Sequence, residues 1–135
     1  MEPTTLHTIL KQHGYSLTKP RQVVFEHLQR SKLLTMSEIV EACTPKINAS
    51  SVYRTVELFE TIGITNRVWS GFKSKLELSE EFRSHHHHLT CADCGQITDF
   101  ENENLENEIN KVAQNIGGQM LEHHIEITIR CSRCL

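Results

Sequence analysis

Two Cys-x-x-Cys pairs constrain this sequence more than any other feature. Cys91 and Cys94 form the first pair, and Cys131 and Cys134 form the second after 36 intervening residues. A tight turn presents two thiolates from each pair, and four sulfurs at about 2.3 Å complete the tetrahedral coordination sphere of Zn²⁺. Because this sphere leaves no position for water, we expect a structural zinc that ties the last strand to the rest of a small domain. Disulfides or free thiols are the alternative, which the absence of a secretion signal disfavours.

Four consecutive histidines, His85 to His88, precede the first cysteine pair within a predicted strand over residues 85–91. Successive side chains of a strand point to opposite faces. His85 and His87 therefore share one face, and His86 and His88 share the other. This parity predicts two separate metal sites rather than one four-histidine cluster, with a solvated polar strand as the alternative. Imidazole suits Zn²⁺, Fe²⁺, Mn²⁺, Co²⁺ and Ni²⁺ alike, so the ligand type leaves the metal open.

Later histidines and acidic residues can complete these sites. In a predicted strand over residues 120–131, His123 shares its face with apolar residues, whereas His124 shares the opposite face with polar ones. We therefore expect His123 to point toward the packed side and to be the better ligand candidate. The acidic residues that can join the histidines are Glu77, Glu80, Glu81, Asp99 and Glu106.

The two halves of the chain differ in charge. Residues 1–75 carry 10 Lys and Arg against 6 Glu, a net charge of +4, whereas residues 76–135 carry 4 Lys and Arg against 11 Asp and Glu, a net charge of −7. The first half can therefore approach a polyanion such as DNA, and the second half can hold cations. Random scatter of surface charge is the alternative explanation.

The apolar pattern of the first half predicts helices followed by a hairpin. The expected elements are helices starting near Thr18–Arg21, over 37–43 and after a cap at Asn48 or Ser50, and strands over 64–69 and 75–78. Three helices and a hairpin are the order of a winged helix-turn-helix domain, whose third helix enters the DNA major groove. We therefore expect an N-terminal winged helix-turn-helix DNA-binding domain over residues 1–78.

The second half predicts a mixed α/β domain. Its expected elements are strands over 85–91, 96–100 and 120–131, and an amphipathic helix over 102–116. Residues 79–84 are the expected hinge, and residues 85–135 the expected C-terminal α/β dimerisation domain, which gives an α+β chain overall. Halves of this size bury little core and usually need a metal or a partner subunit.

These motifs, taken in order, resemble the ferric uptake regulator family of bacterial metalloregulators over nearly the whole chain. The segments that carry the resemblance are Leu17–Arg21, Ser51–Val56, His85–Leu89, Cys91–Gly95 and Cys131–Cys134. The resemblance implies a homodimeric repressor that acts when a regulatory divalent metal is bound: Fe²⁺, Zn²⁺ or Mn²⁺. It also implies a palindromic double-stranded DNA operator that mirrors the two-fold axis of the dimer. Whether peroxide is an input stays open.

The resemblance further implies roles for individual residues. The implied DNA-binding residues are Arg21, Ser51, Tyr53 and Arg54. The implied ligands of the regulatory metal at the hinge are Glu77, His86, His88 and Asp99. Glu80 and Glu81 are alternatives to Glu77, because the chain has an apparent two-residue insertion. Many members carry a histidine where this chain has Leu33 and Leu34; Asp99, as in peroxide-sensing relatives, or a water molecule can take its place, and an altered site is the alternative. The implied ligands of a second site in the dimerisation domain are His85, His87, Glu106 and His123.

Other classes of protein fit the sequence less well. A zinc hydrolase or deaminase needs an open zinc position with a general-base glutamate, as in HExxH or in H-x-E with P-C-x-x-C, and neither motif occurs. We therefore expect no enzyme and no small-molecule substrate. No run reaches the about 20 apolar residues that span a bilayer, so we expect no membrane partner and a cytoplasmic location. A zinc-binding adaptor or metal-storage module without DNA function is the alternative.

Overall fold

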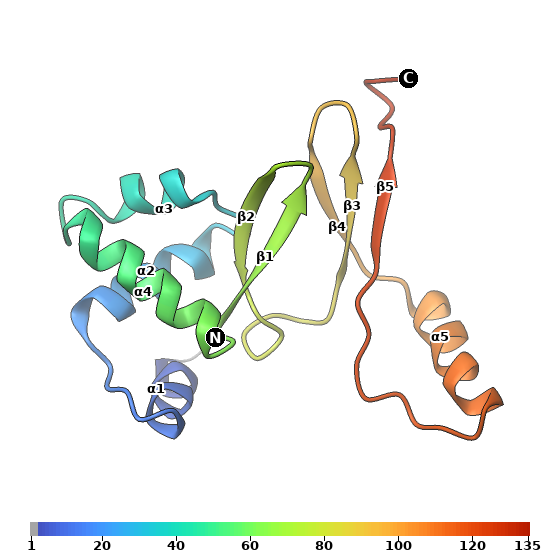
Figure 1. Cartoon of the computed structure of the whole chain (residues 1–135), viewed down its shortest axis with the longest axis horizontal. Helices are drawn as coiled ribbons and strands as arrows, with labels where there is room; N and C mark the ends of the chain where they lie inside the picture. The colour runs from blue at the N-terminus through green and yellow to red at the C-terminus, as the bar shows by residue number, and fades with distance from the viewer. Residues whose placement is uncertain (1–2) are drawn as a thin grey trace. The chain divides into compact units, whose positions relative to one another are not determined.

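The computed structural model describes residues 3–135 and divides into two compact units (Figure 1). The N-terminal unit ends at Ser84, and the C-terminal unit comprises His85–Leu135. The first is mainly helical and the second mainly a sheet, so the chain has the α+β class that the sequence predicts. Within the described residues, no helix is long and apolar enough to cross a membrane.

The N-terminal unit has the element order of a winged helix-turn-helix. Its elements are α1 (Pro3–Gln12), α2 (Lys19–Arg30), α3 (Met36–Cys43), α4 (Ala49–Thr61), β1 (Thr65–Ser70) and β2 (Lys73–Leu78). Strands β1 and β2 pair antiparallel, and Gly71 in the turn between them has a φ of 64°, which glycine adopts without strain. Helix α1 is an addition to the predicted elements. It has few apolar positions, yet Leu6 and Leu10 are both buried.

Side-chain caps fix where the next three helices begin. Thr18, Thr35 and Asn48 each accept a hydrogen bond from the backbone N–H three residues further on. Asn48 rather than Ser50 therefore caps α4. With their starts fixed, the apolar faces of these helices meet in one core. The core includes Val24, Leu28, Ile39, Val52, Val56, Phe59, Ile64 and Leu76.

The segment 79–84, expected as a hinge, packs as part of the N-terminal unit. Phe82 is buried, and its ring meets that of Phe25 on α2 edge-on, with the centroids 4.9 Å apart. The backbone N–H of Phe82 also donates to the carbonyl oxygen of Ser79 at 2.9 Å. The N-terminal unit therefore extends beyond residue 78, and a hinge role of the segment stays a prediction.

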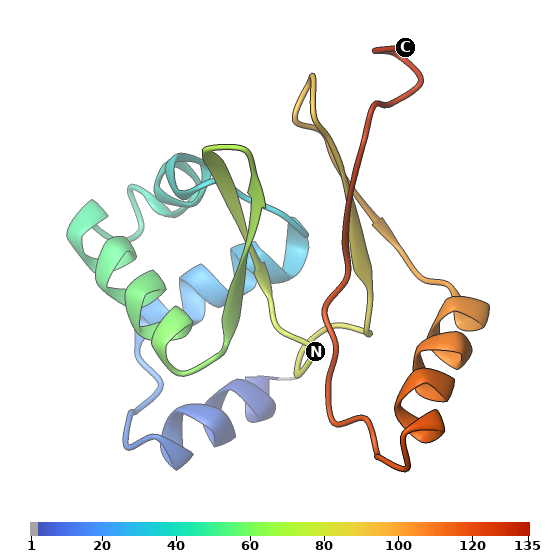
Figure 2. The ribbon, with the colours of Figure 1, turned by 45° about the vertical axis from the view of Figure 1, so that its right-hand side comes forward.

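The C-terminal unit is a three-stranded sheet with one helix. Its elements are β3 (His87–Cys91), β4 (Ile97–Phe100), α5 (Glu103–Asn115) and β5 (Glu126–Ile129). The strand order is β4-β3-β5, with β4 antiparallel and β5 parallel to β3. Figure 2 shows β5 beside β3, to which the chain returns after α5. The parallel register places Ile129 opposite Cys91, which brings the second cysteine pair to the first.

Two strands are shorter than the sequence pattern predicts. Strand β3 begins at His87 rather than at residue 85, and β5 covers only 126–129 of the predicted 120–131. The reason is that β5 finds hydrogen-bonding partners only opposite His88–Cys91, and a strand exists where it has a partner. The expected packed face of this segment is also open, since Leu121, Ile127 and Ile129 are exposed.

Candidate metal centres and recognition helix

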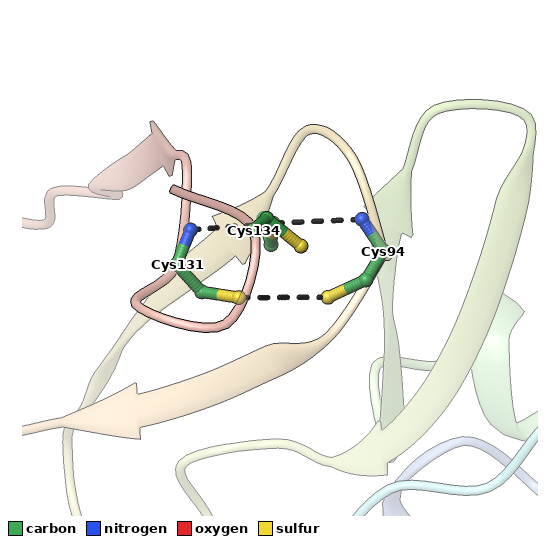
Figure 3. Close-up of side chains that lie close together, drawn as sticks. Cys94, Cys131 and Cys134 are labelled. Atoms are coloured by element: carbon green, nitrogen blue, oxygen red, sulfur yellow. Dashed lines mark hydrogen bonds between the residues drawn. The ribbon is translucent and has the colours of Figure 1, made fainter.

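The four cysteines of the two pairs gather beside the turn between β3 and β4. Their sulfur atoms lie within 4.8 Å of one another, and those of Cys94 and Cys131 face each other at 3.8 Å (Figure 3). Sulfurs that bind a tetrahedral zinc at about 2.3 Å stand about 3.8 Å apart. All four are free thiols rather than disulfides. Their donor chemistry and spacing therefore fit a four-thiolate zinc site.

Backbone N–H groups prepare Cys91 for the thiolate form. The N–H groups of Cys94 and Cys131 point to Cys91 Sγ at 3.5 and 3.4 Å. These hydrogen bonds lower the pKa of Cys91 to about 6, whereas the hydrogen bond to Cys131 raises the pKa of Cys134 to about 12. The thiolate form is thus favoured at Cys91, and metal binding has to release the thiol protons that the cluster still carries.

Two arginines join the turns that carry the cysteines. Arg130 Nε donates to Asp93 Oδ2 at 2.6 Å, and Arg133 donates to Gln96 Oε1. Each pair links a residue beside Cys131–Cys134 to a residue beside Cys91–Cys94. These contacts hold the two turns near each other and position the cysteines for one common ion.

The side chains of His85, His87, Glu106 and His123 form a second cluster. Nε2 of His85 lies 3.0 Å from Nε2 of His123, which in turn lies 3.3 Å from Nε2 of His87. The carboxylate of Glu106 on α5 lies 2.5 Å from His87 Nε2 and 2.8 Å from His123 Nε2. Nitrogens that bind a tetrahedral metal at about 2.0–2.1 Å stand about 3.3 Å apart, so this set also fits a divalent ion.

His124 lies outside this cluster, and its side chain is 84% exposed. The residues from 119 to 125 have no regular strand structure. The strand parity used to separate His123 from His124 therefore does not apply here, although the structure does bring His123, and not His124, to Glu106.

Glu106 has a lowered pKa that predicts a pH-dependent stability. Burial alone would raise its pKa, but the hydrogen bond with His87 and the charges of His123 and His85 hold it below its ordinary 4.5. Such a carboxylate stabilises the fold above pH 4.5, and the contribution is lost as the pH falls through its lowered folded pKa. We expect Glu106→Gln to melt below the unsubstituted protein at neutral pH, and we expect the difference between the two melting temperatures to narrow as the pH falls below 4.5.

Thermal unfolding followed by circular dichroism across this pH range measures the effect. Glu108→Gln is the matched control, because Glu108 is an exposed carboxylate on the same helix whose partner is Lys111. If the difference in melting temperature between Glu106→Gln and the unsubstituted protein stays constant from acid to neutral pH, ionisation of the Glu106 carboxylate does not contribute to stability.

The third cluster lies on the other side of β3. Strands β3 and β4 place His88 directly opposite Asp99, with His88 Nε2 at 3.7 Å from Asp99 Oδ1. The rings of His86 and His88 stand edge to face, with centroids 4.9 Å apart. The ligand atoms of His86, His88 and Asp99 lie within 4.8 Å of one another. Two imidazoles and a carboxylate are an incomplete but suitable set for a divalent metal.

Glu77, the expected fourth ligand, lies on β2 in the N-terminal unit. Its carboxylate is 4% exposed and pairs with the guanidinium of Arg83, with Nη1 and Oε2 at 2.5 Å. Glu80 and Glu81, the alternatives to Glu77, are both exposed. Arg83 was not predictable from the sequence, because an arginine six residues after a strand glutamate has no recognisable pattern.

Helix α4 presents the predicted DNA-binding residues on its outer face. Val52, Thr55 and Val56 are buried, whereas Tyr53 and Arg54 are exposed and Ser51 is half-buried. The buried face packs α4 against the core and leaves its other side accessible to solvent.

Arg21, at the start of α2, is already engaged within the unit. Its Nη1 donates to the carbonyl oxygen of Ser16 at 2.6 Å, and its guanidinium lies 5.3 Å from the ring centroid of Tyr15. The wing formed by β1 and β2 adds two exposed aromatic residues that the sequence analysis did not single out, Trp69 and Phe72. Their exposure in a hairpin was not predictable from apolarity alone.

Residues 12–128 match the profile of the ferric uptake regulator family. The chain belongs to this family. The peroxide-responsive repressor of Staphylococcus aureus is 33% identical over 131 residues, which cover 93% of this chain and 86% of the relative. The ferric uptake regulation protein of Yersinia pestis is 31% identical over 128 residues, covering 90% and 85%.

The fold of this ferric uptake regulator family member also matches a solved relative. The Helicobacter pylori ferric uptake regulator superposes with a TM-score of 0.80 at 26% identity, covering 97% of this chain and 89% of that chain. That regulator is described as having three functional metal binding sites. The expected architecture, a winged helix-turn-helix followed by an α/β domain, is therefore confirmed, and the chain is a metalloregulator.

The segment just before α3, where the family resemblance implies a histidine in many members, carries leucines in this chain. Leu33 and Leu34 are half-buried, and the backbone of Leu34 exchanges hydrogen bonds with Leu76 at 3.0 and 2.7 Å. The segment thus extends the sheet of the wing and carries no metal-ligating side chain. A regulatory site in this chain has to draw its ligands from elsewhere.

Proposed function

We propose that this ferric uptake regulator family member is a homodimeric repressor that binds palindromic double-stranded DNA when a regulatory divalent metal is bound. The observation that carries the proposal is the division of His85–His88 between two clusters of metal-ligating groups. One chain then holds three sets of ligands and an exposed recognition helix. As a DNA-binding regulator it would act in the cytoplasm.

The four-cysteine cluster would hold a structural Zn²⁺. Support comes from the 3.8 Å spacing of Cys94 and Cys131, whose positions lie 37 apart in the chain, and from the backbone N–H groups aimed at Cys91. Bound zinc would cross-link β3 to the segment after β5 through four thiolates. The protein's own contribution is to hold the two turns in register through the pairs made by Arg130 and Arg133.

The other two clusters would hold the labile metals. His86, His88 and Asp99 would bind the regulatory ion together with Glu77, whose assignment rests on the family resemblance, and His85, His87, Glu106 and His123 would form the second site. Ligands drawn from both units would favour one arrangement of the DNA-binding unit over others. The shift can be only as large as the difference in metal affinity between these arrangements. Iron, manganese and zinc are the candidate ions.

The apolar surface of the C-terminal unit would be covered by a second copy of the chain. Helix α5 has no buried residue, and β5 is an edge strand of the sheet. The exposed apolar residues of this region are Val112, Ile116, Leu121, Ile127 and Ile129. An open edge strand beside an apolar helix face is a surface that monomeric proteins avoid and that a two-fold dimer can bury.

Selection from a pool of random-sequence duplex DNA tests the proposal. With Mn²⁺ present we expect the zinc-loaded protein to enrich inverted repeats, and with a mild chelator we expect no enrichment. Binding to the selected DNA should weaken steeply with salt, since the contacts release counterions. Trp69, the single tryptophan, is exposed on the wing, so its fluorescence should change when DNA binds.

A variant of the recognition helix gives the second arm of this test. Arg54→Ala should lower affinity for the selected DNA by about 1–3 kcal/mol, the usual worth of a base-reading arginine, without changing metal binding. Glu57→Gln, an exposed change on the same helix, is the control. Weak, salt-insensitive binding with no enriched sequence would instead favour an adaptor or metal-storage module.

A further inference from the structure

The carboxylate of Glu77 is buried with a cation already beside it. Its side chain is 4% exposed, and that of Arg83 is 17% exposed, with Arg83 Nη1 at 2.5 Å from Glu77 Oε2. Among the described residues of the N-terminal unit, the pair of Arg67 and Glu60 lies closer to solvent, with side chains 32% and 30% exposed. Glu77 and Arg83 therefore form the more buried of these two ion pairs.

The fold delivers Arg83 to Glu77. The neighbouring Phe82 is fixed in the core by its edge-on contact with Phe25 and by its backbone hydrogen bond to Ser79. The position of the Arg83 backbone is thus set by residues of its own unit. Its guanidinium contacts Glu77 on β2, six residues earlier in the chain, because the segment 79–84 packs on the core through Phe82.

A buried carboxylate needs a counter-charge, and losing one partner of a buried pair leaves the other charge uncompensated. A guanidinium or a divalent metal can each supply that charge. Two cations at one carboxylate repel each other, and the repulsion is weakly screened in a buried setting. Occupation of Glu77 by one cation therefore opposes occupation by the other.

We infer that Arg83 is an internal competitor of the regulatory metal for Glu77. In the metal-free protein it neutralises the carboxylate, and a metal ion has to displace or weaken this ion pair to gain the fourth ligand. Arg83 thereby raises the metal concentration at which the regulator responds. This inference rests on the proposed role of Glu77 in the regulatory site.

Titration calorimetry with Mn²⁺ on the zinc-loaded, full-length protein tests the inference. Glu77→Gln should remove or weaken one binding step, which identifies the step that uses this carboxylate. At that step Arg83→Gln should bind Mn²⁺ roughly tenfold more tightly, which corresponds to about 1.4 kcal/mol. Arg67→Gln, which removes the same charge from an exposed pair of the same unit, should leave the step unchanged.

Thermal unfolding supplies a readout that does not depend on calorimetry. Without Mn²⁺, zinc-loaded Arg83→Gln should melt below the unsubstituted zinc-loaded protein, and its gain in melting temperature on adding Mn²⁺ should be larger. Arg83→Lys keeps the charge without the planar guanidinium, so its gain in melting temperature should lie between those of the unsubstituted protein and Arg83→Gln. It replaces Arg83→Gln in the test if that variant does not fold.

The outcomes separate the inference from the proposed function. Weaker or unchanged Mn²⁺ binding by Arg83→Gln, at a step that Glu77→Gln abolishes, overturns the competition and leaves Glu77 as a ligand. If Glu77→Gln alters no binding step, the assignment of Glu77 fails and the inference fails with it. The proposed metal response of the regulator is then judged on His86 and His88 alone.

Discussion

Replacing Cys91 with serine is expected to release the zinc and to unfold the C-terminal unit. Cys91 ends β3, and its sulfur accepts the N–H groups of Cys94 and Cys131, so it is central to the cluster. Structural zinc sites in small domains supply about 10–16 kcal/mol of apparent binding free energy. That range overlaps the upper half of the about 5–15 kcal/mol by which whole domains are stable. A unit of 51 residues, His85–Leu135, buries too little apolar surface to make up for the loss of this binding free energy.

Native mass spectrometry measures this effect directly. The unsubstituted protein should be a dimer that keeps one zinc per chain through mild chelation, whereas Cys91→Ser should lose that zinc and appear as monomer. Cys43→Ala is the matched control, because Cys43 is a buried free thiol on α3 outside the cluster. It should keep both zinc and dimer. A zinc-free Cys91→Ser protein that stays a folded dimer would contradict a structural role of the cluster.

Removing His86 and His88 together should abolish the metal dependence of DNA binding. Both side chains belong to the cluster with Asp99, and their loss leaves one carboxylate of that set. Couplings between effector and ligand are typically 1–3 kcal/mol, so DNA affinity with Mn²⁺ should fall about 5–150-fold, to the level of the metal-free protein. Fluorescence anisotropy of labelled operator DNA, with and without Mn²⁺, measures the change.

The double substitution should leave the dimer and its zinc intact, because the cysteine cluster lies elsewhere in the unit. His124→Ala is the control, since His124 is exposed and outside every cluster. It should respond to Mn²⁺ like the unsubstituted protein. A His86→Ala/His88→Ala protein that still gains DNA affinity with Mn²⁺ would mean that another set of ligands is regulatory.

The sequence predicts much of this fold because its strongest signals are local. The caps at Thr18 and Asn48 and the apolar stripe of α4 depend on residues within a few positions of one another, and the structure has these helices. The Cys-x-x-Cys spacing is equally local, and the structure brings both pairs together. The alternation in His85–His88 also separates the two histidine pairs, although β3 begins only at His87. Metal binding at these clusters stays a prediction.

The missed features depend on contacts between distant residues. Helix α1 has no long apolar stripe in its sequence, and its role becomes visible only because Leu6 and Leu10 are buried in the core. The sequence also named His123 as a ligand beside Glu106, but the strand alternation used to choose it does not exist, because residues 121–125 form no strand. The pair of Arg83 with Glu77 arises from the way Phe82 is seated against α2. No periodicity in the sequence encodes these placements.

The parallel pairing of β5 with β3 also sets an order in time. Parallel strands need a long crossover connection, which here is the chain through α5. Closing such a loop costs conformational entropy before the hydrogen bonds between the strands can form. The N-terminal unit consists of neighbouring helices and a tight hairpin, which form faster. During refolding we therefore expect the N-terminal unit to form first. Under the proposed function, a refolding chain would for that interval carry a folded recognition helix before the clusters that would bind the regulatory metal have formed.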